Sequence, residues 1–137
     1  MGLVLDSGVL IAAERDAKPV SELLATFERE HGETEIVLSA ITVIELEHGL
    51  HRAQTAEQAR KRREYLDTVF AAVPVKPFTR EMAQITAKID AEAQQLGRTI
   101  PFADLLIGAA ALHFGYAVGT RNLRHFPMIP NLAIVPL

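Results

Sequence analysis

Residues 3–12 have the sequence LVLDSGVLIA, in which a single aspartate, Asp6, separates two apolar runs. A short apolar run that ends in the turn-forming residues Asp6-Ser7-Gly8 predicts a buried β-strand over residues 2–5. A carboxylate with so many apolar neighbours is costly to bury unless a partner compensates its charge. Asp6 therefore has two open interpretations: a functional group at the end of a strand, or the N-cap of a helix that begins at Ser7 or Gly8.

Short apolar runs and helical periodicity continue to alternate along the rest of the chain. Further strands are predicted over residues 36–38, 73–75, 116–118 and 133–135. Helices are predicted over residues 19–32, 41–49, 55–70, 79–97 and 101–115, where apolar residues recur at helical spacing. Strands that alternate with helices form a parallel sheet with helices on both faces, so we expect an α/β layer sandwich.

Composition restricts the class of protein further. The chain has 137 residues, of which 49% are hydrophobic and 23% charged, and this suits one globular domain over residues 1–137. It has no cysteine, which excludes thiolate zinc sites and favours a reducing, cytoplasmic location. The longest apolar run, residues 105–112, is shorter than the roughly 20 residues of a membrane-spanning helix, and residues 1–13 do not resemble a secretory signal.

Polar residues stand where an open parallel sheet binds its ligands, beyond the carboxyl ends of the strands. Asp6 follows the first strand, and Glu45 lies within two helical turns of the second. Asp104 opens a late helix, and Asn122 follows the strand over residues 116–118. Because clustered acids repel one another unless a cation lies among them, the pattern predicts a site for Mg²⁺ or Mn²⁺, which prefer oxygen ligands. Such sites activate water and polarise phosphodiesters.

Four segments in this order resemble the PIN-domain ribonucleases of the VapC toxin type. LVLDSGVLIA is similar to the family's opening aspartate with its following hydroxyl residue, and SAITVIELEHG to its S-x-x-x-x-x-E-L-x-x-G segment. IPFADLLIGAAAL is similar to the third acidic motif, and GTRNLRHF to the last strand and loop. Each segment alone is a weak signal, whereas the ordered combination is specific and extends from one end of the chain to the other.

The resemblance implies a PIN-like three-layer α/β/α sandwich with four or five parallel strands, and magnesium-dependent endonuclease cleavage of RNA. It also implies a homodimer inhibited by a small antitoxin protein, as in a type II toxin–antitoxin pair. By the same resemblance, Asp6, Glu45 and Asp104 are expected to be the catalytic metal ligands, with Ser7 and Asn122 as accessory groups. The expected mechanism has Asp6 and Asp104 hold the metal while Glu45 ligates it or orients the attacking water.

The last loop departs from the family pattern. Many members carry a fourth acid there, whereas Asn122 and His125 occupy the candidate positions in this chain. An amide oxygen can ligate a hard cation but adds no charge, so one metal ion is expected rather than two. Thr120 and Arg121 lie in the same loop and are expected to be accessory residues. Arg121 or Arg124 would hold the phosphate, unless both belong to an ordinary solvated loop.

Other charged groups leave further interpretations open. Glu45, His48 and His51 stand at three-residue intervals and would share one helix face, as zinc ligands do, but no second histidine pair follows. Residues 60–63, Arg-Lys-Arg-Arg, form either a solvated helix face or an RNA-contacting rim. The net charge of −3 does not favour nucleic-acid binding, although bound divalent ions reverse the local charge of an acidic site.

Two other classes of protein compete with the nuclease. Phosphatases that form an aspartyl-phosphate also begin with an aspartate after the first strand, but they favour a second aspartate where Gly8 stands. A catalytically weak or inactive module of the same fold, which binds RNA or a protein, is the main alternative, and metal-dependent turnover distinguishes it from an enzyme. No dinucleotide-binding or P-loop motif is present.

Overall fold

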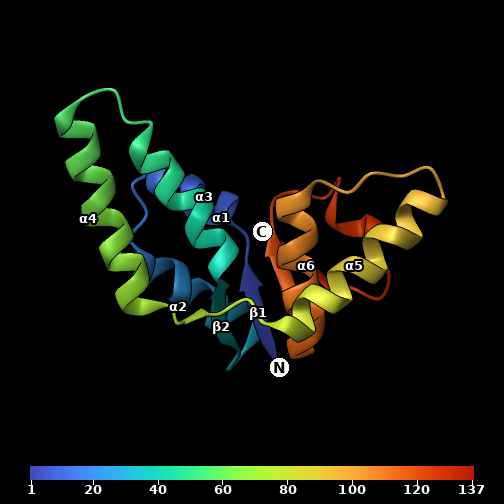
Figure 1. The fold of residues 1–137 in the computed structure, drawn as a ribbon. Helices are drawn as coiled ribbons and strands as arrows, with labels where there is room; N and C mark the ends of the chain where they lie inside the picture. Colours follow the sequence, from blue (N-terminus) through green and yellow to red (C-terminus); the bar gives the residue numbers. More distant parts are fainter.

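Five short parallel strands form the centre of the fold (Figure 1). They are β1 (Gly2–Leu5), β2 (Glu35–Ser39), β3 (Val75–Lys76), β4 (Ala117–Thr120) and β5 (Ile134–Pro136). The computed structural model, which describes residues 1–137, places them in the order β3-β2-β1-β4-β5 with every pairing parallel. All four residues of β1 are buried, as expected for the central strand of a sheet covered on both faces. The strand order reverses between β1 and β4, where ligands bind in sheets of this type.

Six helices cover the two faces of the sheet. They are α1 (Ser7–Arg15), α2 (Val20–His31), α3 (Ala40–His51), α4 (Ala56–Ala72), α5 (Arg80–Gln95) and α6 (Phe102–Phe114). Helices α1 to α4 lie on one side of β1 and β2, and α5 and α6 lie on the other (Figure 1). Neighbouring strand residues face opposite ways, so Leu5 belongs to the core cluster under α1 to α4 and Val4 to the cluster under α5 and α6. The predicted three-layer α/β/α sandwich is confirmed, with five strands.

The helix-forming stretch at residues 105–112 lies in the core, as its apolar sequence suggests. Leu105, Ile107 and Ala109 to Ala111 are buried in α6. None of the helices combines the length and the apolar character needed to cross a bilayer.

Three details of the secondary structure differ from the sequence-based expectation. The sequence indicates helix α1 only through the possible N-cap role of Asp6, yet this helix is nine residues long. The strand predicted over residues 73–75 begins two residues later, because Val73 ends α4 and Pro74 has no N–H to donate to a ladder. Leu96 continues the near-helical spacing of the apolar residues Met82, Ile85 and Ile89, yet it is 71% exposed because it caps α5 just before Gly97 turns the chain at φ +70°.

The basic run at residues 60–63 of α4 is engaged in ion pairs within the protein. The pairs are Arg60 with Glu57 and Glu64, Lys61 with Glu57, Arg62 with Glu14, and Arg63 with Glu47 and Asp67. Arg62 thereby joins α4 to α1, and Arg63 joins α4 to α3. An RNA-contacting rim would need free cationic charge, and most of the charge of this run is already compensated.

Gly49 leaves space for the Arg62 guanidinium. A Cβ atom at Gly49 would lie 2.5 Å from Nη1 of Arg62, so a larger residue there would require the guanidinium to shift. Tyr65, one turn along α4, donates a hydrogen bond of 2.6 Å to the Leu10 carbonyl. Burial raises the pKa of Tyr65 to about 12, so the hydroxyl remains a donor at neutral pH. These contacts fix α4 against α1 and α3, the two helices that carry Ser7 and Glu45.

We expect Arg62 and Glu14 to stabilise the fold as a coupled pair. Both side chains are 24% exposed; Nε of Arg62 donates a charge-assisted hydrogen bond of 2.7 Å to Oε2 of Glu14, and Nη2 lies 2.6 Å from Oε1. A double-mutant cycle with Arg62→Met and Glu14→Gln, measured by urea unfolding, should give a coupling energy of about 1–3 kcal/mol.

The exposed pair Arg60–Glu64 is the matched control, because its side chains are 56% and 65% exposed. Its coupling energy should stay below about 0.5 kcal/mol. Equal coupling energies for the two pairs would contradict the structural role assigned to Arg62.

Candidate active site

Asp6 lies at the switch point of the sheet, where β1 ends beside β4. Its backbone N–H donates to the Gly119 carbonyl at 2.9 Å, and its side chain is the N-cap of α1. Oδ1 accepts the Ser7 backbone N–H at 2.9 Å, and Oδ2 accepts the Thr120 hydroxyl at 2.9 Å. The two interpretations that the sequence leaves open are therefore compatible, because each oxygen that accepts one hydrogen bond keeps a further lone pair.

Glu45 reaches the same edge of the sheet from α3. Ser39, at the end of β2, caps this helix by accepting the Ile41 N–H at 3.1 Å, and Glu45 follows in the second turn. The Ser7 hydroxyl donates to Glu45 Oε1 at 3.2 Å, so one serine stands between Asp6 and Glu45. Oε2 of Glu45 has no hydrogen-bond donor within the protein and is free to meet a ligand.

Asp104 comes from the first turn of α6. Its Oδ2 atom accepts hydrogen bonds from His125 Nδ1 at 2.9 Å and from Asn122 Nδ2 at 3.4 Å. An ionised carboxylate only accepts hydrogen bonds, so Nδ1 of His125 carries the proton. Nδ2 of Asn122 and Nδ1 of His125 lie 3.2 Å apart because both donate to Oδ2 of Asp104. Oδ1 of Asp104 has no hydrogen-bond donor within the protein.

The loop after β4 connects Asp6 with Asp104. The Asn122 backbone N–H donates to Thr120 Oγ1 at 2.8 Å, and Thr120 in turn donates to Asp6. The Asn122 side chain continues the chain of hydrogen bonds to Asp104. The structure thus brings Asp6, Glu45 and Asp104 to one edge of the sheet, with Ser7 and Thr120 between them.

Asn122 has a different role from the metal ligand that its position suggests. Its Oδ1 atom accepts the backbone N–H groups of Arg124 and His125 at 3.1 and 3.2 Å, so the amide oxygen faces the loop. His125, which the sequence offers only as a candidate for the fourth acidic position, contacts Asp104 directly. The spacing Asn-x-x-His is the signal for this contact, because an asparagine that binds the backbone two and three residues ahead turns the chain back on itself.

The electrostatics of the site are those of a carboxylate cluster that no lysine or arginine neutralises and that His125 contacts at Asp104. Burial raises the pKa of the Asp6 carboxyl, and repulsion from Asp104 adds to this against the lowering effect of the Thr120 and Ser7 hydrogen bonds. Burial likewise raises the pKa of Glu45, as do the charges of Asp6 and Asp104. No lysine or arginine forms an ion pair with any of the three.

The three carboxylates are neighbours but do not form a closed cluster. No three acidic or histidine side chains lie close enough together to make a ready-made metal site. The alternative zinc ligands Glu45, His48 and His51 do not converge on one point. The Glu45 side chain contacts Ser7, while His48 and His51 are exposed. The arrangement offers oxygen donors with free lone pairs around an open edge of the sheet.

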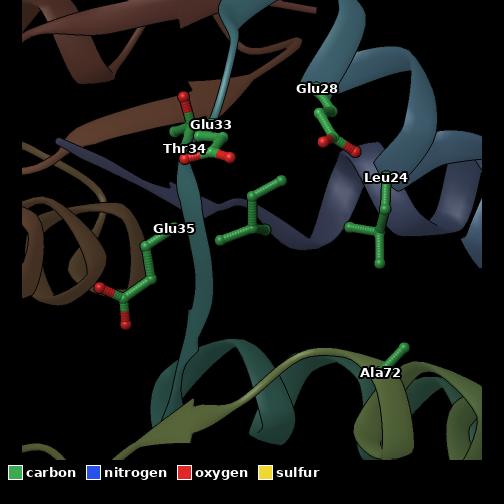
Figure 2. A pocket seen from close by; sticks show the side chains of 7 residues that line it. Leu24, Glu28, Glu33, Thr34, Glu35 and Ala72 are labelled. Carbon is green, nitrogen blue, oxygen red and sulfur yellow. The ribbon is translucent and has the colours of Figure 1, made fainter.

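Two hollows of about 470 Å³ are lined by none of the three acids. One of them lies beside the start of β2, at the end of that strand opposite Ser39 (Figure 2). Glu28, Glu33 and Glu35 line it together with Leu24 and no basic residue. Asp6, Glu45 and Asp104 line neither this hollow nor the other one of similar volume.

Comparison with known proteins gives the family. The family model of the PIN domain matches residues 3–129. The chain belongs to the PIN-domain family. Ribonuclease VapC of Rickettsia bellii is 29% identical to this PIN-domain chain over 139 residues, which cover the whole chain and 98% of that relative. VapC ribonuclease Y4jK of Sinorhizobium fredii is 34% identical over 129 residues, or 90% of the chain and 89% of the relative.

Solved structures support the same fold. VapBC2 from Rickettsia felis, bound to a DNA fragment from its promoter, matches with a TM-score of 0.86 at 20% identity and covers 100% of this chain and 99% of its own. FitAcB from Neisseria gonorrhoeae matches with a TM-score of 0.77 at 26% identity and covers 96% and 95%. The resemblance to PIN-domain proteins of the VapC type that the sequence carries is thereby confirmed.

The raised pKa of Asp6 makes its charge a cost to the folded state when no cation is bound. Its folded pKa lies above the unfolded value of 3.8, so the folded protein binds this proton more tightly and loses stability as the pH rises through that range. Asp6→Asn keeps a residue that caps helices well and removes the charge. In EDTA at pH 7 we expect it to raise the free energy of unfolding by about 0.5–2 kcal/mol, measured with urea.

The gain should shrink towards pH 4, where the wild-type carboxyl binds its proton. Asp67→Asn, which removes an exposed carboxylate of α4, is the control and should leave stability unchanged or slightly lower. A wild type that is more stable than Asp6→Asn in EDTA at pH 7 would show that the Asp6 charge is compensated.

Proposed function

We propose that this PIN-domain chain is a divalent metal-dependent endoribonuclease and the toxin of a type II toxin–antitoxin pair. The observation that carries the proposal is the gathering of Asp6, Glu45 and Asp104 at the β1–β4 switch point without a lysine or arginine partner. Relatives with the name ribonuclease VapC align over nearly the whole chain, which supports the same activity here. A cytoplasmic location follows from this role.

The residues of the site fit Mg²⁺ or Mn²⁺. Carboxylate oxygens are the ligands that these hard cations prefer, and Oδ1 of Asp104 and Oε2 of Glu45 are free of hydrogen-bond donors. A cation among the three acids would offset the repulsion that raises the pKa values of Asp6 and Glu45. One ion is proposed, because the amide oxygen of Asn122 already accepts two backbone N–H groups. When bound, the ion would polarise the phosphodiester and make a water more acidic.

The side chains of this chain have separate roles in the proposed reaction. Asp6 and Asp104 would hold the cation, and Glu45 would ligate it or accept a proton from the attacking water through Oε2. Ser7 positions Glu45 by its hydrogen bond to Oε1. Thr120 positions Asp6 in the same way.

Asn122 and His125 are positioning residues for Asp104, because both donate to Oδ2 and leave Oδ1 for the cation. The loop that carries Asn122 and His125 thus orients Asp104. A fourth acid in this loop would instead add a charged metal ligand. This difference favours a site with one ion.

Asp6→Asn and Asp104→Asn should each lower RNA cleavage in Mg²⁺ by about 10²-fold or more, since each removes a charged ligand from an electrostatic site. Cleavage of total cellular RNA, followed by sequencing of the fragment ends, measures the activity and identifies the target. EDTA should abolish it. Lys88→Ala, on the exposed side of α5, is the control and should cleave like wild type.

The binding-module alternative predicts a different set of results. Wild type and Asp6→Asn would then bind RNA or a protein equally well, and neither would turn over RNA in Mg²⁺. Equal cleavage by wild type and Asp6→Asn would instead remove the carboxylate mechanism while leaving a nuclease of another kind.

A small antitoxin protein and a second copy of the chain are the proposed partners. Solved complexes of VapBC proteins have this fold, which supports the first of them. Co-expression with the product of a neighbouring small open reading frame should yield a co-purifying complex that no longer cleaves RNA. Sedimentation of the chain alone should give the mass of a dimer, and a monomer would contradict the second proposal.

A further inference from the structure

A hollow of about 240 Å³ lies between α1, α2 and the segment that follows β4. Its floor is apolar and includes Val9, Leu23 and Phe27. Two cationic side chains, Lys18 and Arg121, line it from different segments of the chain. An apolar floor beside two cations suits a ligand that joins an apolar or aromatic group to a phosphate.

Two residues that line the hollow, Val9 and Arg121, lie close in the chain to residues of the carboxylate cluster. Val9 lies in the first turn of α1, the helix that Asp6 caps. Arg121 directly follows Thr120, whose hydroxyl donates to Asp6 at 2.9 Å. Consecutive Cα atoms are about 3.8 Å apart, and a helical turn rises about 5.4 Å, so the hollow begins within one nucleotide's reach of Asp6.

The end of α1 places Lys18 at this hollow. Ala17 has a left-handed conformation with φ +52°, and the Lys18 N–H donates to the Ala13 carbonyl at 2.8 Å. This ending of the helix reverses the chain and returns Lys18 towards α1. A non-glycine residue at positive φ is uncommon, so the turn is fixed by its hydrogen bonds and by the packing of α1 on α2.

Neither Lys18 nor Arg121 forms a direct ion pair, although two acids, Asp16 and Glu30, line the same hollow. Both acids contact a basic side chain that does not line the hollow. Asp16 pairs with Arg15 at 3.4 Å, and Glu30 approaches His31 at 3.8 Å. The four cations of α4 are paired, so they are less available to a phosphate than Lys18 and Arg121. Arg124, in the loop after β4, is also unpaired but does not line the hollow.

We propose that the hollow binds the nucleotide adjacent to the cleaved phosphate of a single-stranded RNA. Lys18 and Arg121 contact its phosphate, and its base lies against the apolar floor beside Val9. Phosphate contacts set the register of a nucleic acid, and unstacked bases bind to apolar or aromatic surfaces. The proposal rests on the proposed ribonuclease function, because the carboxylate cluster defines which phosphate is cleaved.

The test measures binding and cleavage separately with the full chain. Binding of a fluorescently labelled single-stranded RNA is followed by anisotropy in EDTA over a series of salt concentrations, and cleavage is followed in Mg²⁺. Lys18→Ala and Arg121→Ala should each reduce the slope of log affinity against log salt by about 0.7, and the double variant by about 1.4. The double variant should also lose preference for single-stranded over double-stranded RNA.

Lys61→Ala is the matched control, because it removes the same charge from an exposed position of α4 that already pairs with Glu57. Its slope should equal that of wild type. The nucleotide site would be overturned if wild type did not bind the RNA. It would also be overturned if the salt slopes of Lys18→Ala and Arg121→Ala equalled that of the control. If the two substitutions weaken only the co-purification of a small protein partner, the hollow binds a peptide and the proposal is equally overturned.

The two proposals fail in different ways. Cleavage in Mg²⁺ with unchanged salt slopes in the variants overturns the nucleotide site and leaves the ribonuclease. Altered slopes with no cleavage by wild type support the nucleotide site in a binding module and overturn the ribonuclease.

Discussion

The mutual repulsion of three carboxylates at the end of the central strand is the constraint on which the rest of the structure depends. A parallel sheet with its switch point between β1 and β4 brings Asp6 next to Thr120, and the helices α3 and α6 bring Glu45 and Asp104 to the same edge. Burial and repulsion raise the pKa values of Asp6 and Glu45, so this edge is electrostatically unfavourable without a cation. Unfavourable interactions of this kind are common at functional sites, and the stability that core packing supplies elsewhere offsets them.

The hydrogen bonds around the acids explain how they remain neighbours without a cation. Ser7 lies between Asp6 and Glu45, and the Thr120–Asn122–His125 loop lies between Asp6 and Asp104. Each polar side chain donates to one carboxylate oxygen, which stabilises the charge and leaves another lone pair free. The hydroxyl and amide groups thus separate the charges and orient the oxygens at the same time. The packing of α4 on α1 and α3 through Arg62 and Arg63 holds the two helices that carry Ser7 and Glu45.

The sequence predicts the sheet, most helices and the grouping of the acids, because these depend on local periodicity and on one topological rule. It does not predict contacts that depend on side-chain direction. The amide oxygen of Asn122 is a possible metal ligand by its chemistry, but it accepts hydrogen bonds from two backbone N–H groups of the loop. Leu96 follows helical spacing, but the helix ends before it and leaves it exposed. Lys18 has no pattern to mark it, since its position depends on the left-handed Ala17 and on a hollow formed by distant segments.

A count of basic residues is a poor guide to where a net acidic protein meets RNA. The four consecutive cations of α4 are the most obvious basic feature of the sequence, yet each forms an ion pair, two of them between helices. Paired charges attract a phosphate weakly, because the neighbouring acid repels it at nearly the same distance. Lys18 and Arg121 form no ion pair and line one hollow, and Arg121 directly follows Thr120, whose hydroxyl donates to Asp6. The electrostatic attraction for a phosphate is therefore determined by which cations lack partners, and this is a property of the fold.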